Sequence, residues 1–180
     1  MNKSMLDSQP IYTKQLITKK ITVPFNKYSP GIVQYFIDYA NEHFMGKCCK
    51  EGYISNEYVK IIKYSAPKMN GKDLLFDIVF EFNVYYPFED QEIYTLVTNI
   101  TKIGIKSVIN LNEHKNPITV FVSRLQNSHI SITDEDDDLN NTEGLSPYNN
   151  GDVIKIKIIG YRFEINDSSI YALGEVIAEK

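Results

Sequence analysis

The chain has 180 residues, of which 43% are hydrophobic and 23% are charged, and its net charge at pH 7 is −4. That hydrophobic fraction is enough to build a core, which excludes a globally disordered chain. No apolar run approaches the roughly 20 residues of a membrane-spanning helix, and residues 1–10 lack the apolar segment of a signal peptide. We therefore expect a soluble intracellular protein. Its two cysteines, Cys48 and Cys49, are adjacent, which favours reduced thiols over a disulfide or a zinc site.

The charge is divided unevenly between the two halves. Residues 1–86 contain 11 Lys and 8 Asp or Glu, a net charge of +3, whereas residues 87–180 contain 8 Lys or Arg and 15 Asp or Glu, a net charge of −7. Five of these acids form one run, from Asp134 to Asp138. Proteins that bind duplex nucleic acid usually carry a basic domain, because phosphate neutralisation supplies much of the affinity. The composition argues against such a partner.

The first half predicts one helix and three strands. Residues 11–23 alternate as a strand does, and Pro24 ends the pattern. Ser29 is a suitable N-cap with Pro30 at the first helical position, and apolar residues then recur at helical spacing to about Met45, where Gly46 follows. Strands are predicted at 51–65, with a kink at Ser55-Asn56, and at 73–86, separated by a turn at 66–72.

The second half predicts only short strands. Pro87 marks the expected boundary between a domain at 1–86 and a domain at 87–180. Five short strands at even spacing indicate a small closed barrel, of which the OB fold is the commonest type. These strands are expected at 92–99, 102–109, 118–124, 153–161 and 168–177, with an acidic loop at about 126–150. The fold class is thus α+β: a small α/β domain, with one helix on an antiparallel sheet, followed by a five-stranded OB-type β-barrel.

No group of residues typical of an enzyme is present in the sequence. The three histidines are scattered, and none has a partner at a metal-ligand interval. Gly46-Lys47-Cys48 resembles the end of a phosphate-binding loop, but the first glycine and the terminal hydroxyl residue of that motif are missing. We expect no catalytic residue, no metal and no cofactor.

Four segments of the sequence resemble a known family when they are taken in order. They are GIVQYFIDYANEHFMGKCCKEGYI (31–54), VYYPFEDQEIYTLVTNITKIGI (84–105), PITVFVSR (117–124) and KIKIIGYRFEINDSSIYALGEV (155–176). Together they resemble the stalk subunit of DNA-directed RNA polymerases, a family that comprises the seventh subunit of the eukaryotic enzyme, its archaeal counterpart and homologues in large DNA viruses. The resemblance runs from about Tyr12 to Ile177.

This resemblance implies a role in transcription as a non-catalytic polymerase subunit. The first domain would be the tip that anchors the stalk on the large catalytic and small core subunits, through two loops. The residues implied in that contact are Pro24, Asn26, Tyr28, Pro30, Ala66, Pro67, Lys68, Met69, Asn70 and Gly71. A subunit-four-type partner could complete the stalk, and no membrane is involved. The protein would act in the cytoplasm or virion if it is viral, and in the nucleus if it is cellular.

The barrel would be the RNA-binding module of the family, lying near the exit of the nascent transcript. Single-strand binding needs stacking aromatics and a cationic track. The available residues are Lys102, Lys106, Phe121, Arg124, Lys155, Lys157, Tyr161 and Arg162. Binding is expected to be weak, because the position after Gly104 is Ile105 rather than an aromatic residue. The alternative is a free-standing single-stranded RNA-binding OB-fold protein, although such a protein has no use for residues 1–86.

Overall fold

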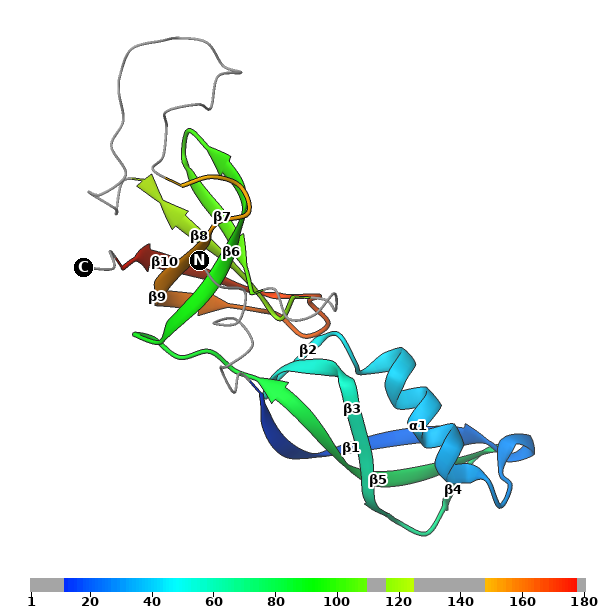
Figure 1. Ribbon diagram of the computed structural model, residues 1–180. Helices are drawn as coiled ribbons and strands as arrows, with labels where there is room; N and C mark the ends of the chain where they lie inside the picture. Colours follow the sequence, from blue (N-terminus) through cyan, green and yellow to red (C-terminus); the bar gives the residue numbers. More distant parts are fainter. Residues whose placement is uncertain (1–11, 110–115, 125–147, 178–180) are drawn as a thin grey trace, which may run out of the picture.

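The computed structural model describes residues 12–109, 116–124 and 148–177. Within them the chain forms a sheet covered by one helix, followed by a closed five-stranded barrel (Figure 1). The predicted α+β class, with one helix on an antiparallel sheet and a small barrel after it, is confirmed at this level. No helix in these ranges is long and apolar enough to span a bilayer.

The sheet is built around its longest apolar strand. Its order is β1-β5-β3-β2, and β4 pairs with the start of β5; the bounds are β1 Thr13–Pro24, β2 Cys48–Cys49, β3 Gly52–Tyr64, β4 Lys68–Asn70 and β5 Asp73–Tyr85. The even-numbered residues of β5, from Leu74 to Val84, are all buried, and the strand is central because it pairs with β1 on one side and with β3 and β4 on the other. The β3–β5 register shifts between Ile54 and Val59, where the kink was predicted.

The helix α1 (Ile32–His43) packs one stripe of side chains on this sheet. Phe36 is fully buried, with its ring centroid 5.1 Å from that of Phe76. The predicted N-cap is wrong: Gly31 occupies that position without a side-chain hydrogen bond, and Ser29 instead accepts the Ile32 N–H through its carbonyl, at 3.0 Å. The helix also ends at His43, slightly before the predicted end.

The barrel has the strand order β10-β8-β7-β6-β9 and is closed by pairing of β9 with β10. Its strands are β6 Glu92–Thr101, β7 Gly104–Val108, β8 Ile118–Ser123, β9 Val153–Arg162 and β10 Ile170–Val176, close to the predicted ranges. The β8–β10 pair is parallel and the other four pairs are antiparallel. Alternating residues such as Ile154, Ile156 and Ile158 fill the interior. The acidic run of the predicted loop lies outside the described residues.

A packed seam joins the sheet to the barrel. The Cys48 N–H donates to the Asp167 carbonyl at 2.8 Å, and the Asn166 N–H donates to the Cys48 carbonyl at 2.9 Å, so the β9–β10 turn covers β2. Tyr53 and Tyr85, from β3 and β5, are each 1% exposed and belong to the barrel's hydrophobic cluster. The core of the barrel therefore includes residues of the sheet.

Candidate functional site

The two loops expected to contact a polymerase core lie together at one end of the sheet, remote from the barrel (Figure 1). The two loops lie together because of how β5 pairs: its first residue, Asp73, is opposite Pro24 of β1 on one side and Asn70 of β4 on the other. The segment after β1 and the β4–β5 hairpin must therefore meet at this point. We call residues 24–30 and 66–72 the distal end.

All ten residues predicted for polymerase contact are exposed at the distal end: Pro24, Asn26, Tyr28, Pro30, Ala66, Pro67, Lys68, Met69, Asn70 and Gly71. Met69 is 71% exposed, and it projects from a hairpin that turns at Gly71, whose φ is +63°. Tyr28 is 50% exposed, although its ring stacks on buried Phe76 at 6.2 Å. Two large apolar side chains thus face solvent, one of them packed on a buried ring, as in a binding surface.

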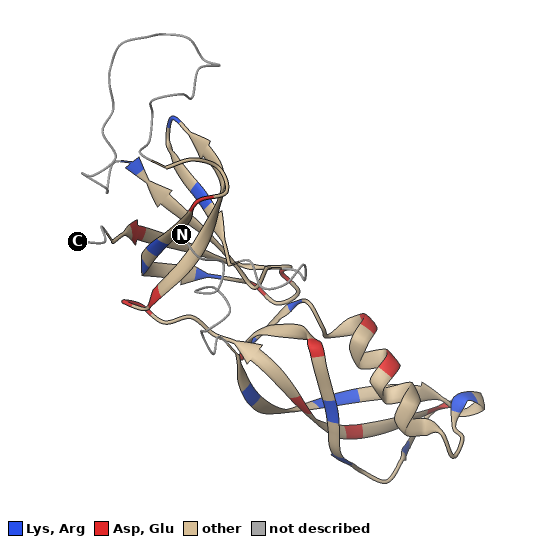
Figure 2. Cartoon of the chain, viewed as in Figure 1, with Lys and Arg blue, Asp and Glu red and all other residues tan. Residues whose placement is uncertain are grey.

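Sequence reasoning missed Phe25, which is 62% exposed in a short 3₁₀ turn, Phe25–Lys27, of the distal end. The alternation of β1 would place Phe25 inward, as it does Val23, and the 3₁₀ turn that begins at this residue exposes it instead. Lysines surround the apolar residues, and Lys68 is bound to Asp77 at 3.2 Å. Figure 2 shows basic and acidic positions interspersed over the sheet and the barrel, without a continuous basic stripe.

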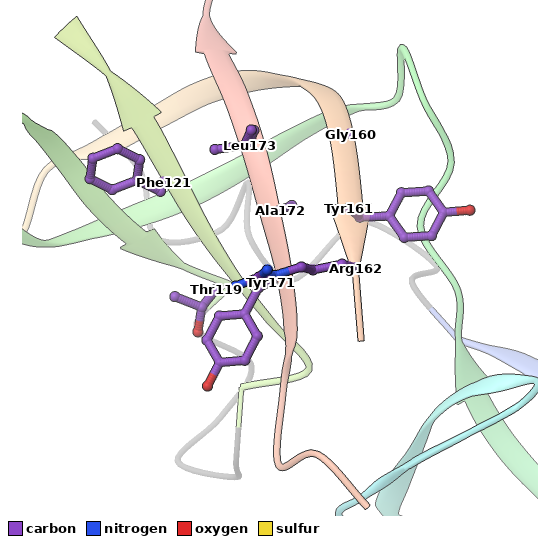
Figure 3. Close-up of a pocket in the computed structure, with 8 residues that line it drawn as sticks. All are labelled: Thr119, Phe121, Gly160, Tyr161, Arg162, Tyr171, Ala172 and Leu173. Carbon is purple, nitrogen blue, oxygen red and sulfur yellow. The ribbon is translucent and has the colours of Figure 1, made fainter. Parts of the chain in front are cut away.

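A second candidate surface is a groove on the outside of the barrel, with a volume of about 480 Å³ (Figure 3). Its lining comes from β8, β9 and β10 and consists of Thr119, Phe121, Gly160, Tyr161, Arg162, Tyr171, Ala172 and Leu173. The pairing places these residues in two rows across the strands. One row is Phe121, Leu173 and Gly160, and the other is Thr119, Tyr171 and Arg162.

The groove exists because one of its positions has no side chain. A Cβ added at Gly160 would meet nothing within 4 Å, so this position forms an open floor beside Leu173. The β9–β10 register also shifts at Leu173/Gly174, which separates the two strands' side chains locally. In Figure 3 the Arg162 side chain extends across β10 toward Thr119 and Tyr171. The largely apolar groove therefore has a positively charged side chain at its border.

Tyr161 lines the groove but does not turn its ring into it. The ring points away in Figure 3, and its centroid lies 5.6 Å from that of Tyr86. The Tyr161 hydroxyl donates to the Tyr86 hydroxyl at 3.2 Å, and this hydrogen bond, with partial burial, raises the pKa of Tyr161 to about 12. Tyr161 supports the domain junction, and Phe121 is the stacking aromatic among the predicted RNA-binding residues that faces the groove.

The predicted basic residues do not form one track. Lys106 is exposed opposite Phe121 in the β7–β8 pairing, and Lys102 is exposed in the β6–β7 turn. Lys155 instead pairs with Glu92 of β6 at 2.6 Å, and Lys157 pairs with Asp90, in the turn before β6, at 2.7 Å. The hydrogen bond to Asp90 is also the main cause of the raised pKa of Lys157.

Arg124, also predicted to bind RNA, is only 7% exposed, so little of this residue is accessible to a nucleic acid. Arg124 lies directly after β8, where its backbone N–H donates to the Ile103 carbonyl at 3.2 Å. Sequence reasoning also missed Tyr171 and Leu173, which are about half exposed on the outer face of β10. The sequence did indicate them, because two large apolar residues occupy positions of β10 that alternate with its buried residues and so face water.

The buried thiols are unsuited to nucleophilic chemistry. Burial raises the pKa of Cys48 to about 12 and that of Cys49 to about 11, so both are protonated at neutral pH. In the described ranges, no three His, Cys, Asp or Glu side chains are grouped closely enough to hold a metal ion.

A scan of the chain against models of protein families gives no match, and a search of curated proteins gives none either. The resemblance to polymerase stalk subunits remains a prediction from the quoted segments.

Proposed function

We propose that this chain is a non-catalytic stalk subunit of a DNA-directed RNA polymerase, which docks through its distal end on the large catalytic and small core subunits. The observation that carries the proposal is the convergence of two exposed loops, with Met69 and Tyr28, at the end of the molecule remote from the barrel. A few large side chains of this kind supply most of the energy of protein interfaces.

The barrel, in the same proposal, is of the OB type and guides nascent RNA weakly. Support for the fold type comes from the strand order and from the parallel pairing of the third and fifth barrel strands, which is the arrangement of OB folds. Support for RNA comes from Phe121, with Lys106 beside it and Arg162 on the other side of the groove. A base stacked on Phe121 would have a cation on each side for its phosphates.

Affinity purification tests the docking proposal. The chain tagged at its C-terminus should recover the two large polymerase subunits from the cells or particles that contain it. A variant carrying Pro67→Asp and Met69→Asp should lose them, because two charges would enter an apolar contact. The matched control is Ile103→Asp, since Ile103 is 72% exposed at the far end of the barrel. Equal recovery by all three chains would contradict docking at the distal end.

A free-standing RNA-binding protein is the second candidate, and the groove at Phe121 is the observation that favours it. The same purification separates the two functions. Recovery of RNA without polymerase subunits, unaffected by the distal-end changes, would support the second candidate and exclude the first.

A further inference from the structure

One edge strand of the sheet is covered by another part of the chain, and the outer side of the other edge strand has no partner strand in the described ranges. At one side, the two-residue strand β2 is covered by the β9–β10 turn through both backbone hydrogen bonds of Cys48. At the other side, β1 runs for 12 residues and pairs with β5 alone, and no strand in the described ranges pairs with its outer edge. A long edge with unused N–H and C=O groups is a template for another strand.

The side chains of β1 show what kind of strand this edge suits. Ile17, Ile21 and Val23 are buried beneath α1, whereas the even-numbered residues lie on the uncovered face of the sheet. Lys14 and Lys20 are exposed on that face, and Leu16 between them is 63% exposed. The strand also contains Lys19 and has no Asp or Glu.

Neighbouring acids engage these lysines only in part: Lys14 forms a loose ion pair with Glu81 and lies 4.9 Å from the centroid of the Tyr58 ring, and both lysines remain exposed. Asp77, opposite Lys20 on β5, is already bound to Lys68 at 3.2 Å. Glu81 accepts a hydrogen bond from the Tyr58 hydroxyl at 2.5 Å and lies farther from Lys14, at 3.8 Å. The edge therefore presents an apolar side chain between two exposed cations.

We propose that the outer edge of β1 accepts an extended acidic segment of a partner polypeptide as an added antiparallel strand. Backbone hydrogen bonds would supply the affinity, and alternate side chains the specificity. Acidic residues would lie opposite Lys14 and Lys20, with an apolar residue opposite Leu16. A second copy of the chain fits poorly, because self-pairing centred on Ile17 would place Lys14 opposite Lys20 of the other copy. The proposal does not depend on docking to a polymerase.

A matched pair of peptides tests it on the full chain. The probe Glu-Thr-Thr-Thr-Val-Thr-Glu, in antiparallel register, places Glu opposite Lys20 and Lys14 and Val opposite Leu16. The control peptide has Lys in place of both Glu. Backbone hydrogen exchange should be fast at the outward amides of β1 in the free chain and slower with the acidic peptide. The acidic peptide should bind at least about fivefold more tightly, because both cross-strand charge pairs change sign.

Charge reversal supplies the decisive comparison. The variant Lys14→Glu/Lys20→Glu should prefer the lysine peptide, whereas Lys102→Glu/Lys106→Glu, with the same change in net charge on the barrel, should keep the wild-type preference. Three results would overturn the proposal. They are equal binding of both peptides, slow exchange along all of β1 in the free chain, and protection of β1 that depends on protein concentration without peptide, the sign of self-pairing.

Discussion

Replacing Tyr85 tests the seam between sheet and barrel. Tyr85 ends β5, is 1% exposed and belongs to the barrel's hydrophobic cluster. An aromatic side chain buries about 150–250 Å², which at about 25 cal/mol per Å² is roughly 4–6 kcal/mol. Measured aromatic-to-alanine changes in cores are about 3–5 kcal/mol. We therefore expect Tyr85→Ala to lower the free energy of unfolding by about 3–5 kcal/mol.

Tyr85→Phe is the matched control at the same position. It keeps the ring and removes only the hydroxyl, which is buried and has no hydrogen-bond partner among the described residues. A buried hydroxyl without a partner is destabilising, by about 1–3 kcal/mol. The phenylalanine variant should therefore be as stable as wild type within about 1 kcal/mol, or more stable.

Calorimetry and denaturant titration give the readout. Because Tyr85 belongs to the sheet by sequence and to the barrel by packing, the alanine variant should lower the unfolding temperature of both parts together, in one transition. Two separate transitions, of which only one moves, would refute the packed seam. A phenylalanine variant as unstable as the alanine variant would show that the hydroxyl has an important partner.

Three further predictions concern the turns, the thiols and the groove. Gly52→Ala should lower the free energy of unfolding by more than about 1 kcal/mol, because φ is +126° and the new Cβ would lie 2.3 Å from the Tyr85 carbonyl oxygen. Gly71→Ala, whose Cβ would meet nothing within 4 Å, should lower it less, as measured by thermal denaturation. Cys48 and Cys49 should react with a disulfide reagent only on unfolding. Because their folded pKa values, about 12 and about 11, exceed the unfolded value of 9.0, the thiol contribution to stability should hold below pH 9 and fall as the pH rises above it. Phe121→Ala should weaken binding of single-stranded RNA by roughly 1–3 kcal/mol in a fluorescence titration, the range for one stacked base; unchanged affinity would remove the groove from the RNA site.

The alternation of apolar residues did not predict the two short strands, since both residues of β2 are buried and all three residues of β4, within the predicted turn at 66–72, are exposed. It did predict the longer strands, most of which bury alternate residues. The even-numbered residues of β5 and the isoleucines of β9 at 154, 156 and 158 follow it without exception. The helix start was not predictable from Ser29, since a favourable N-cap residue does not determine where the backbone turns, and here it turns at Gly31.

The candidate RNA site was less predictable, because it depends on which strands are neighbours. The pairing of Lys155 with Glu92 follows from β9 lying beside β6, which no local pattern shows. Arg124 was assigned by residue type, and its burial directly after the end of β8 depends on how the strands pack. The distal end, in contrast, consists of local loops, and all of its predicted residues are exposed.

Site-specific photo-crosslinking tests docking through the distal end most directly. A photoreactive amino acid would replace Met69 at the distal end or Ile103 on the barrel, since the two side chains are equally accessible, at 71% and 72%. Docking through the distal end predicts crosslinks from position 69 to a large polymerase subunit in the assembled enzyme, and none from position 103 to the same region. Crosslinks to the polymerase core from position 103 alone would contradict it.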